Sequence, residues 1–518
     1  MMQIKICHSR NSSLSVIRLF TRSTRRLRFI HRIYAFLCSL TLFATLIIAF
    51  GCNDTQTNPL EIGTEMVEIT PPIGYPRYGY PPVESTGIKD PLNAKALVFK
   101  QGNIQGALLV CDLLGIPRDL SRIVRERVSE QTGIPFQNIS ISATHTHTSP
   151  GITQDFKEYA LRESSGNLTE EDKEGYFTYL INGMTEAIIS ASESTEEVEM
   201  ISGIGDAPGI SFNRRHLMTD GRVRTNPGRL NPKIVRPVGP ADPDVNFVLF
   251  RPAGQTNFST SLTVFASHYV RGGTEFSADY PFYLQKRLRE IFGDQLFSVF
   301  GLGACGNINT VDFLGTSPVD DSIPRVIKFG NTLAEAVERA LPEGKEGIPD
   351  LEIISRTVYL PMQGYTEDEL QWSKEGTEPL YNERSFLQRR RRLKISIWGV
   401  QPPLEMLRKY DAVPPSVSGD PWHLPVEIHA FRLDSRTAIV TMPGELFVEF
   451  GIDLKRRSPF SNTMLIELAN ADIAYVPTEQ AFREGDYEPV NSRLAPGSGE
   501  KMVDIAIDML TELKKSEP

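Results

Sequence analysis

Cysteine is scarce in this chain, which has five cysteines in 518 residues. No two of them have the spacing of a zinc-binding pair, and they are too few for a disulfide framework. Cys7, Cys38 and Cys52 lie near the N-terminus, so only Cys111 and Cys305 belong to the main body. The sequence leaves open whether these two form a disulfide. Any metal site must therefore be built from histidine, carboxylate or tyrosine side chains.

Basic residues are also in short supply beyond the N-terminus. The whole chain has a net charge of −9, but from residue 52 onward it holds 47 basic and 64 acidic residues. A protein that binds the phosphate backbone of nucleic acid is expected to carry a basic patch. We therefore expect no nucleic-acid partner.

Low-complexity segments, internal repeats and long Ser/Gly linkers are absent from residue 60 onward. The composition is 40% hydrophobic and 23% charged, which is typical of a globular protein with a large core. The body is predicted to be one compact unit or two closely joined lobes.

The N-terminal segment has the character of an export signal. Residues 1–32 carry eight lysines and arginines and no acid, and the 19 residues 33–51 are uncharged. The sequence Ala49-Phe50-Gly51-Cys52 resembles the bacterial lipobox, in which the cysteine is lipidated. An uncleaved membrane span is the alternative, since 19 apolar residues can also cross a bilayer.

Both readings of this segment place the body outside the cytoplasm. We expect residues 1–51 to be a lipoprotein-type export signal, 52–61 a polar tether and 62–518 the functional body. The expected location is the bacterial cell envelope, with a lipid anchor at Cys52 holding the protein to a membrane.

Strand, helix and strand follow one another in the apolar pattern of the body. The order is clear over residues 108–143 and 262–300, and it recurs more loosely over 437–457. A helix between two strands is typical of a crossover connection. The predicted fold class is α/β, with mixed β-sheets, crossover helices and a closing helix over residues 500–514.

Histidines stand where two of the predicted strands end. His145 and His147 occur in the string SATHTHTSPG, and because they are two residues apart on a strand they can face the same side. His268 follows the alternating apolar residues of a second strand. Taken alone, such histidines are more often hydrogen-bonded structural residues than metal ligands, so the pattern suggests a metal site at strand ends without requiring one.

Several motifs, in order from about residue 62 to 500, resemble those of the neutral and alkaline ceramidases. These are zinc-dependent amidases that split ceramide into sphingosine and a fatty acid. The resemblance implies one zinc ion per chain held by a histidine of the Thr-His-Thr-His string, the histidine of Ser267-His268, the glutamate of Pro-Gly-Glu and the tyrosine of Ala-Tyr-Val-Pro-Thr. These ligands are His145, His268, Glu445 and Tyr475.

The same resemblance assigns three residues to catalysis. His147 corresponds to the proton-transfer or oxyanion partner, Tyr487 to the second family tyrosine and Arg214 to the arginine of an Asn-Arg pair. Two imidazoles, a carboxylate and a phenolate suit zinc and leave a position for an activated water. The expected reaction is hydrolysis of a linear amide by that water, with His147 protonating the leaving amine.

Structural roles remain possible for the individual residues. Tyr475 could be a buried strand tyrosine, Glu445 a carboxylate at a helix start and Arg214 an ion-pair partner. The assignment rests on their occurring together in the order of the family.

Two departures from the family pattern leave the substrate open. Asn309 stands where the ceramidases have a serine, and we expect no C-terminal β-sandwich domain. The expected substrate is a lipid such as ceramide or another small N-acyl compound. There are two alternatives. The protein could be a zinc-dependent esterase, or it could be a non-catalytic binding protein of the envelope that kept the fold.

Overall fold

The computed structural model describes residues 58–77, 83–150, 170–270, 272–316, 324–364, 366–368, 371 and 422–516. The predicted export signal and the first six residues of the tether lie outside these ranges. Within the described part of the chain, no helix has both the length and the apolarity needed to span a membrane.

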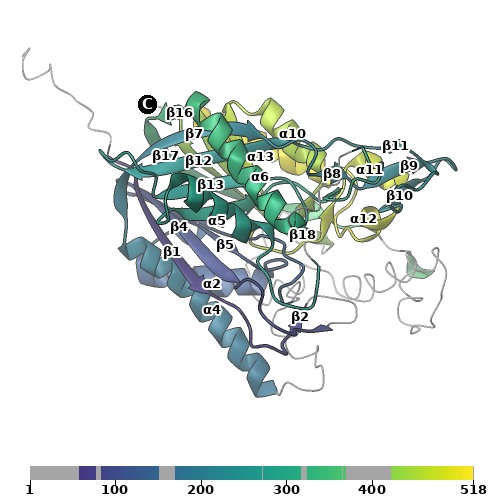
Figure 1. The fold of residues 1–518 in the computed structure, drawn as a ribbon, viewed down its shortest axis with the longest axis horizontal. Helices are drawn as coiled ribbons and strands as arrows, with labels where there is room; N and C mark the ends of the chain where they lie inside the picture. The colour runs from purple at the N-terminus through teal and green to yellow at the C-terminus, as the bar shows by residue number, and fades with distance from the viewer. Residues whose placement is uncertain are drawn as a thin grey trace, which may run out of the picture. The chain divides into compact units, whose positions relative to one another are not determined.

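The largest element is a nine-stranded sheet with the order β14-β13-β12-β7-β1-β4-β5-β6, to which β16 adds beside β7 (Figure 1). Most neighbouring strands are antiparallel, but β5 with β6 and β13 with β14 run parallel. Its strands are β1 (Glu61–Glu68), β4 (Asn93–Gln101), β5 (Ile104–Cys111), β6 (Ile139–Ala143), β7 (Glu196–Asp206), β12 (Asp244–Pro252), β13 (Thr260–Phe265), β14 (Phe297–Leu302) and β16 (Lys345–Gly347).

A second sheet of four strands has the order β17-β18-β19-β21. Its last pair, β19 and β21, is parallel, whereas the other pairs are antiparallel. The strands are β17 (Pro349–Pro361), β18 (His423–Asp434), β19 (Thr437–Thr441) and β21 (Asn462–Ile466).

The two sheets pack face to face and helices cover their outer faces. Between the sheets lies an apolar layer in which the Phe99 ring is 6.3 Å from both Phe250 of the large sheet and Phe431 of the small one, measured between centroids. The outer face of the large sheet carries α2 (Arg118–Thr132), α4 (Glu170–Glu193), α5 (Tyr280–Phe292) and α6 (Arg325–Ala340). The small sheet carries α10 (Val448–Arg457) and α13 (Ser498–Lys515).

This α/β/β/α arrangement confirms the predicted mixed α/β class with crossover helices. All three predicted units exist: α2 joins β5 to β6, α5 joins β13 to β14 and α10 joins β19 to β21, each between parallel strands. In α2 the helical spacing buries Leu120, Val124 and Val128 against the sheet. The closing helix corresponds to α13.

Backbone hydrogen bonds join the two sheets at the carboxyl ends of these parallel strands. The N–H of Glu467 donates to Leu302 O at 2.8 Å, and the N–H of Asn470 donates to Ile141 O at 2.7 Å. The loops that follow the parallel strands therefore meet at one place, which is where binding sites of such sheets usually form.

Several short elements complete the fold. They are β2 (Pro76–Arg77), β3 (Val83–Glu84), β8 (Phe212–Asn213), β9 (Arg215–Met218), β10 (Val223–Thr225), β11 (Ile234–Pro237), β15 (Ile308–Asn309), β20 (Glu445–Leu446), β22 (Tyr475–Val476), α11 (Glu479–Glu484), α12 (Tyr487–Val490) and the 3-10 turns η1 (Phe136–Asn138) and η2 (Leu341–Glu343). Cys111 and Cys305 are both buried free thiols, so the disulfide that the sequence left open is not formed.

Candidate metal centre

His145 lies two residues beyond the end of β6 in a backbone conformation that is costly for a residue with a side chain. Its φ angle is 62°, in the left-handed region that favours glycine. Residues held this way cluster at functional sites, because the surrounding structure must stabilise them. The bend turns the His145 ring towards the junction of the two sheets, where it is buried.

His268 occupies the equivalent place after β13. The loop around it is fixed by α5, because the Asp279 carboxylate at the start of that helix accepts hydrogen bonds from the N–H groups of Val270 and Tyr280. The Tyr280 hydroxyl also donates to Ser267 O at 2.9 Å. His268 is thereby held in a buried position on a rigid turn.

Glu445 and Tyr475 are neighbours on two short parallel strands, β20 and β22. Gly444, directly before Glu445, has a φ of 86°, and a Cβ there would lie 2.6 Å from the Ile473 side chain and 2.8 Å from Ala474 O. Only glycine fits this turn. Ala474, directly before Tyr475, also has a positive φ, at 60°.

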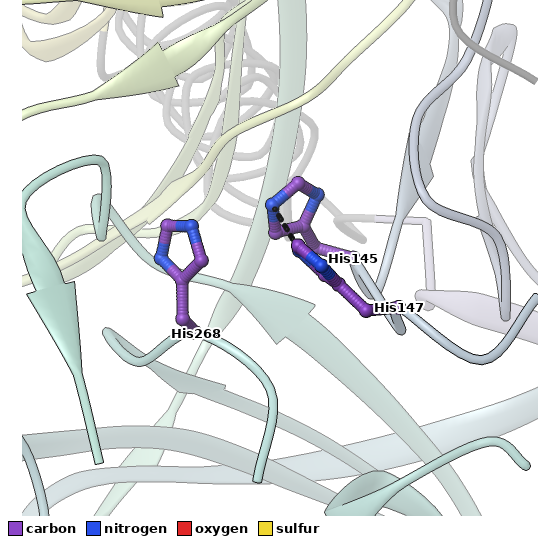
Figure 2. Close-up of side chains that lie close together, drawn as sticks. All are labelled: His145, His147 and His268. Atoms are coloured by element: carbon purple, nitrogen blue, oxygen red, sulfur yellow. Dashed lines mark hydrogen bonds between the residues drawn. The ribbon is translucent and has the colours of Figure 1, made fainter. Parts of the chain in front are cut away.

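These loops bring three imidazoles together (Figure 2), and the Glu445 carboxylate lies beside two of them. The possible ligand nitrogens of His145, His147 and His268 lie within 4.8 Å of one another. Glu445 Oε2 is 3.4 Å from His145 Nε2 and 3.3 Å from His268 Nε2. Among the residues that the structure describes, the three histidines and Glu445 thus form one cluster.

The hydrogen bonds on the far side of the two rings fix their tautomers. His145 Nδ1 lies 2.6 Å from Leu114 O, and His268 Nδ1 lies 2.8 Å from Cys305 O. A carbonyl oxygen can only accept, so each Nδ1 carries the hydrogen, and when a ring is neutral its Nε2 lone pair faces Glu445.

Glu445 Oε2 is buried and has no hydrogen-bond partner. Two lone-pair nitrogens and a carboxylate oxygen that face one another repel unless a cation lies among them. Histidines whose other nitrogen donates to a carbonyl are the usual form of metal-ligating imidazoles. The donor set therefore fits a divalent metal with a preference for nitrogen and oxygen ligands, such as zinc.

The local pKa shifts follow from burial and from these charges. Burial lowers the pKa of His268 to about 4, helped by the nearby Arg214 guanidinium. The pKa of His147 also falls well below its usual range through burial and the two neighbouring rings. Burial would lower the pKa of His145, but the neighbouring Glu445 carboxylate raises it by more, so the net shift is upward. Burial would raise the pKa of Glu445, yet His145 and His268 hold it well below its usual range.

His147 lies beside the proposed ligands rather than apart from them. Its Nε2 is 3.2 Å from His145 Nε2, and its ring stacks on Tyr269 with the centroids 3.9 Å apart. The Arg77 side chain donates to its backbone carbonyl. The His147 ring therefore lies close enough to the cluster to act either as a third histidine ligand or as a proton-transfer group.

Tyr475, Tyr487 and Arg214 lie together on one side of the cluster. The two tyrosine rings are 5.7 Å apart, and the Arg214 guanidinium carbon is 5.3 Å from the Tyr475 ring centroid. Burial, together with Glu445, raises the pKa of Tyr475 well above its usual range. Every residue assigned to the site by the sequence is therefore found at this junction.

Arg214 is held in place by a buried glutamate. Its Nε donates to Glu488 Oε1 at 2.9 Å, its Nη2 donates to Gly306 O at 2.6 Å, and its Nη1 lies 3.2 Å from His268 Nε2. Glu488 is fully buried and also accepts from Arg215 and Thr225. The paired charges orient Arg214 towards the cluster.

Comparisons with known proteins give the same picture of the fold. No family model matches the sequence. The chain is 27% identical over 164 residues to the neutral ceramidase of Mycobacterium tuberculosis, a match that covers 30% of this chain and 25% of that protein's length. The crystal structure of neutral ceramidase from Pseudomonas aeruginosa superposes over 89% of this chain and 75% of its own, with a TM-score of 0.63 and 18% identity. A structure described as ceramidase complexed with C2 gives the same TM-score and identity.

The chain has the neutral ceramidase fold. The predicted resemblance to the neutral ceramidases is thus confirmed at the level of the fold, and the predicted site residues lie where the strand-end loops of this fold converge.

Asn309, which replaces the serine of the ceramidase pattern, lies near this site. It belongs to β15, which pairs with β8 directly before Arg214. Its amide donates to Asn226 Oδ1 at 2.8 Å and its carbonyl accepts from the N–H of Val311. In this chain the side chain therefore connects two loops.

Three side chains that support this cluster were not singled out by the sequence. Glu467 and Glu488 are fully buried, and Tyr269 stacks on His147. Glu467 had a recognisable signal, since it directly follows the apolar run that forms β21. Glu488 and Tyr269 had none, because their roles depend on contacts between distant segments.

Proposed function

We propose that this protein is a zinc-dependent hydrolase that cleaves a linear amide bond in an N-acyl lipid, such as ceramide, or in another N-acyl compound. The observation that carries the proposal is the unpaired Glu445 Oε2 facing the Nε2 atoms of His145 and His268. The amide substrate is supported by the similarity of the sequence and of the fold to proteins named as ceramidases.

His145, His268, Glu445 and Tyr475 are the residues that would hold the zinc. When bound, the metal would supply a Lewis acid that lowers the pKa of water at the site and polarises a carbonyl. Leu114 O and Cys305 O keep the two imidazoles in the tautomer that binds metal.

The remaining side chains would handle the charge and the protons of the reaction. Tyr487 and Arg214 lie on the same side of the cluster and would donate hydrogen bonds to the oxygen that becomes negative when water adds to the amide. His147 would accept the proton released in that addition and pass it to the leaving amine. Tyr269, stacked on the His147 ring, would hold it in position.

Export and lipid anchoring at Cys52 remain predictions of the sequence, since residues 1–57 lie outside the described part of the chain. A lipid substrate agrees with that location, because an anchored enzyme meets its substrate at the membrane surface.

Matched amide and ester substrates test the proposal. We expect the purified protein to hydrolyse a short-chain N-acyl sphingosine, to lose this activity after treatment with a zinc chelator and to regain it when zinc is added. Release of the free amine, measured by liquid chromatography and mass spectrometry, is the readout. Turnover of the matching O-acyl ester alone would make the protein an esterase, and turnover of neither would favour a binding protein.

A further inference from the structure

Glu467 is a fully buried carboxylate directly after β21. Its Oε1 accepts from the backbone N–H of Cys305 at 3.2 Å and from the Cys305 thiol at 3.1 Å. Its Oε2 accepts from the backbone N–H of Leu446 at 2.7 Å. The donors to this carboxylate are therefore two amides and a thiol rather than an arginine or lysine.

Both loops that Glu467 contacts carry a proposed zinc ligand. The carbonyl of Cys305 accepts the Nδ1 hydrogen of His268, so a shift of Cys305 moves that ring. Leu446 directly follows Glu445 and shares its short strand β20. One oxygen of Glu467 thus fixes the support of His268, and the other fixes the backbone next to Glu445.

The two loops come from different sheets. Cys305 follows β14 of the large sheet, and Leu446 follows β19 of the small sheet. The carboxylate bridges them from the end of β21, and its own N–H donates to Leu302 O at the end of β14. The spacing of His268 and Glu445 therefore depends on how the sheets are joined at this point.

We propose that Glu467 is a positioning residue that holds the His268 and Glu445 halves of the metal site at the separation that zinc requires. The proposal rests on the zinc site of the proposed function. Burying a carboxylate without a basic partner is costly. The contribution of Glu467 to folding stability therefore does not by itself explain why a carboxylate is placed there. Supports behind metal ligands typically contribute about 10- to 100-fold to metal affinity.

Glu467→Gln tests the proposal with almost no change in volume. Whichever way the amide is turned, its NH₂ faces either the Leu446 N–H or the Cys305 N–H and thiol, so one loop is pushed away. We expect zinc to dissociate about 10- to 100-fold more readily, as measured by competition with a chromophoric chelator. The absorption spectrum of the cobalt(II)-loaded protein should change as well, because it reports the ligand geometry directly.

Asp434→Asn is the matched control. Asp434 is a buried carboxylate that accepts from the N–H groups of Arg436 and Thr437 at the opposite end of β19. It should change thermal stability only, with the zinc affinity and the cobalt spectrum unaltered. Glu467→Asp, which keeps the carboxyl group but is too short to reach both loops, serves as a second variant if the glutamine variant does not fold.

Wild-type zinc affinity and an unaltered cobalt spectrum in a folded Glu467 variant would overturn the positioning role while leaving the proposed function intact. Failure of the wild-type protein itself to bind zinc would instead refute the proposed function. Equal weakening by the Asp434 control would show that general loss of stability, not positioning, sets the affinity.

Discussion

Replacing Glu445 by glutamine is expected to remove the zinc and to lower amide hydrolysis by about 10³-fold or more. Although burial alone would raise its pKa, His145 and His268 hold the pKa of Glu445 well below its usual range, so the side chain is a carboxylate at neutral pH. Its Oε2 lies 3.4 Å from His145 Nε2 and 3.3 Å from His268 Nε2. Glutamine keeps the shape but takes away the charge that offsets a divalent cation.

Metal content by elemental mass spectrometry and the rate of amine release measure the two halves of this prediction. The Asp434→Asn variant again serves as the control, because it changes one buried carboxylate to an amide at the end of β18, in the turn that precedes β19. A Glu445→Gln protein that keeps both its zinc and its rate would remove Glu445 from the ligand set.

Tyr487→Phe is expected to keep the zinc and still lose about 10²- to 10³-fold in turnover. The Tyr487 ring lies 5.7 Å from that of Tyr475, on the side of the cluster where Arg214 is also found. A hydroxyl that donates to the developing oxyanion contributes mainly in the transition state, so kcat should fall much more than KM changes.

A distant tyrosine provides the comparison for this loss. The Tyr179 hydroxyl on α4 donates to Glu68 O at 2.6 Å, so Tyr179→Phe removes one hydroxyl and one hydrogen bond away from the site. Its turnover should match the wild type. Equal rates for Tyr487→Phe and Tyr179→Phe would mean that Tyr487 takes no part in the reaction, and loss of zinc from Tyr487→Phe would point to a ligand instead.

The sequence predicted the parts of the site that follow from local patterns. Apolar alternation located the ends of β6 and β13, and His145 and His268 stand two and three residues beyond these ends. The resemblance of Pro-Gly-Glu to the ceramidase motif indicated Glu445, and in the structure the glycine of this motif forms the turn before it with a φ of 86°. Three parallel crossover units were also predictable, because each is continuous in the sequence.

The supporting contacts could not be predicted in the same way. Arg214 is held by Glu488, which lies 274 residues away in the chain, and Glu467 reaches Cys305 across 162 residues. Such pairs form only when the two sheets pack together. The local pattern of apolar residues does not predict which buried carboxylate will contact which loop. The tautomers of the two imidazoles likewise depend on distant carbonyls, Leu114 O and Cys305 O.

The most direct test of the metal centre is the zinc content of the purified wild-type protein, measured by elemental mass spectrometry after dialysis against zinc-free buffer. We predict about one zinc per chain, which two histidines, a glutamate and a tyrosine would hold. No bound metal, even after the protein has been supplied with zinc, would contradict the proposed hydrolase and leave the ceramidase fold without its chemistry.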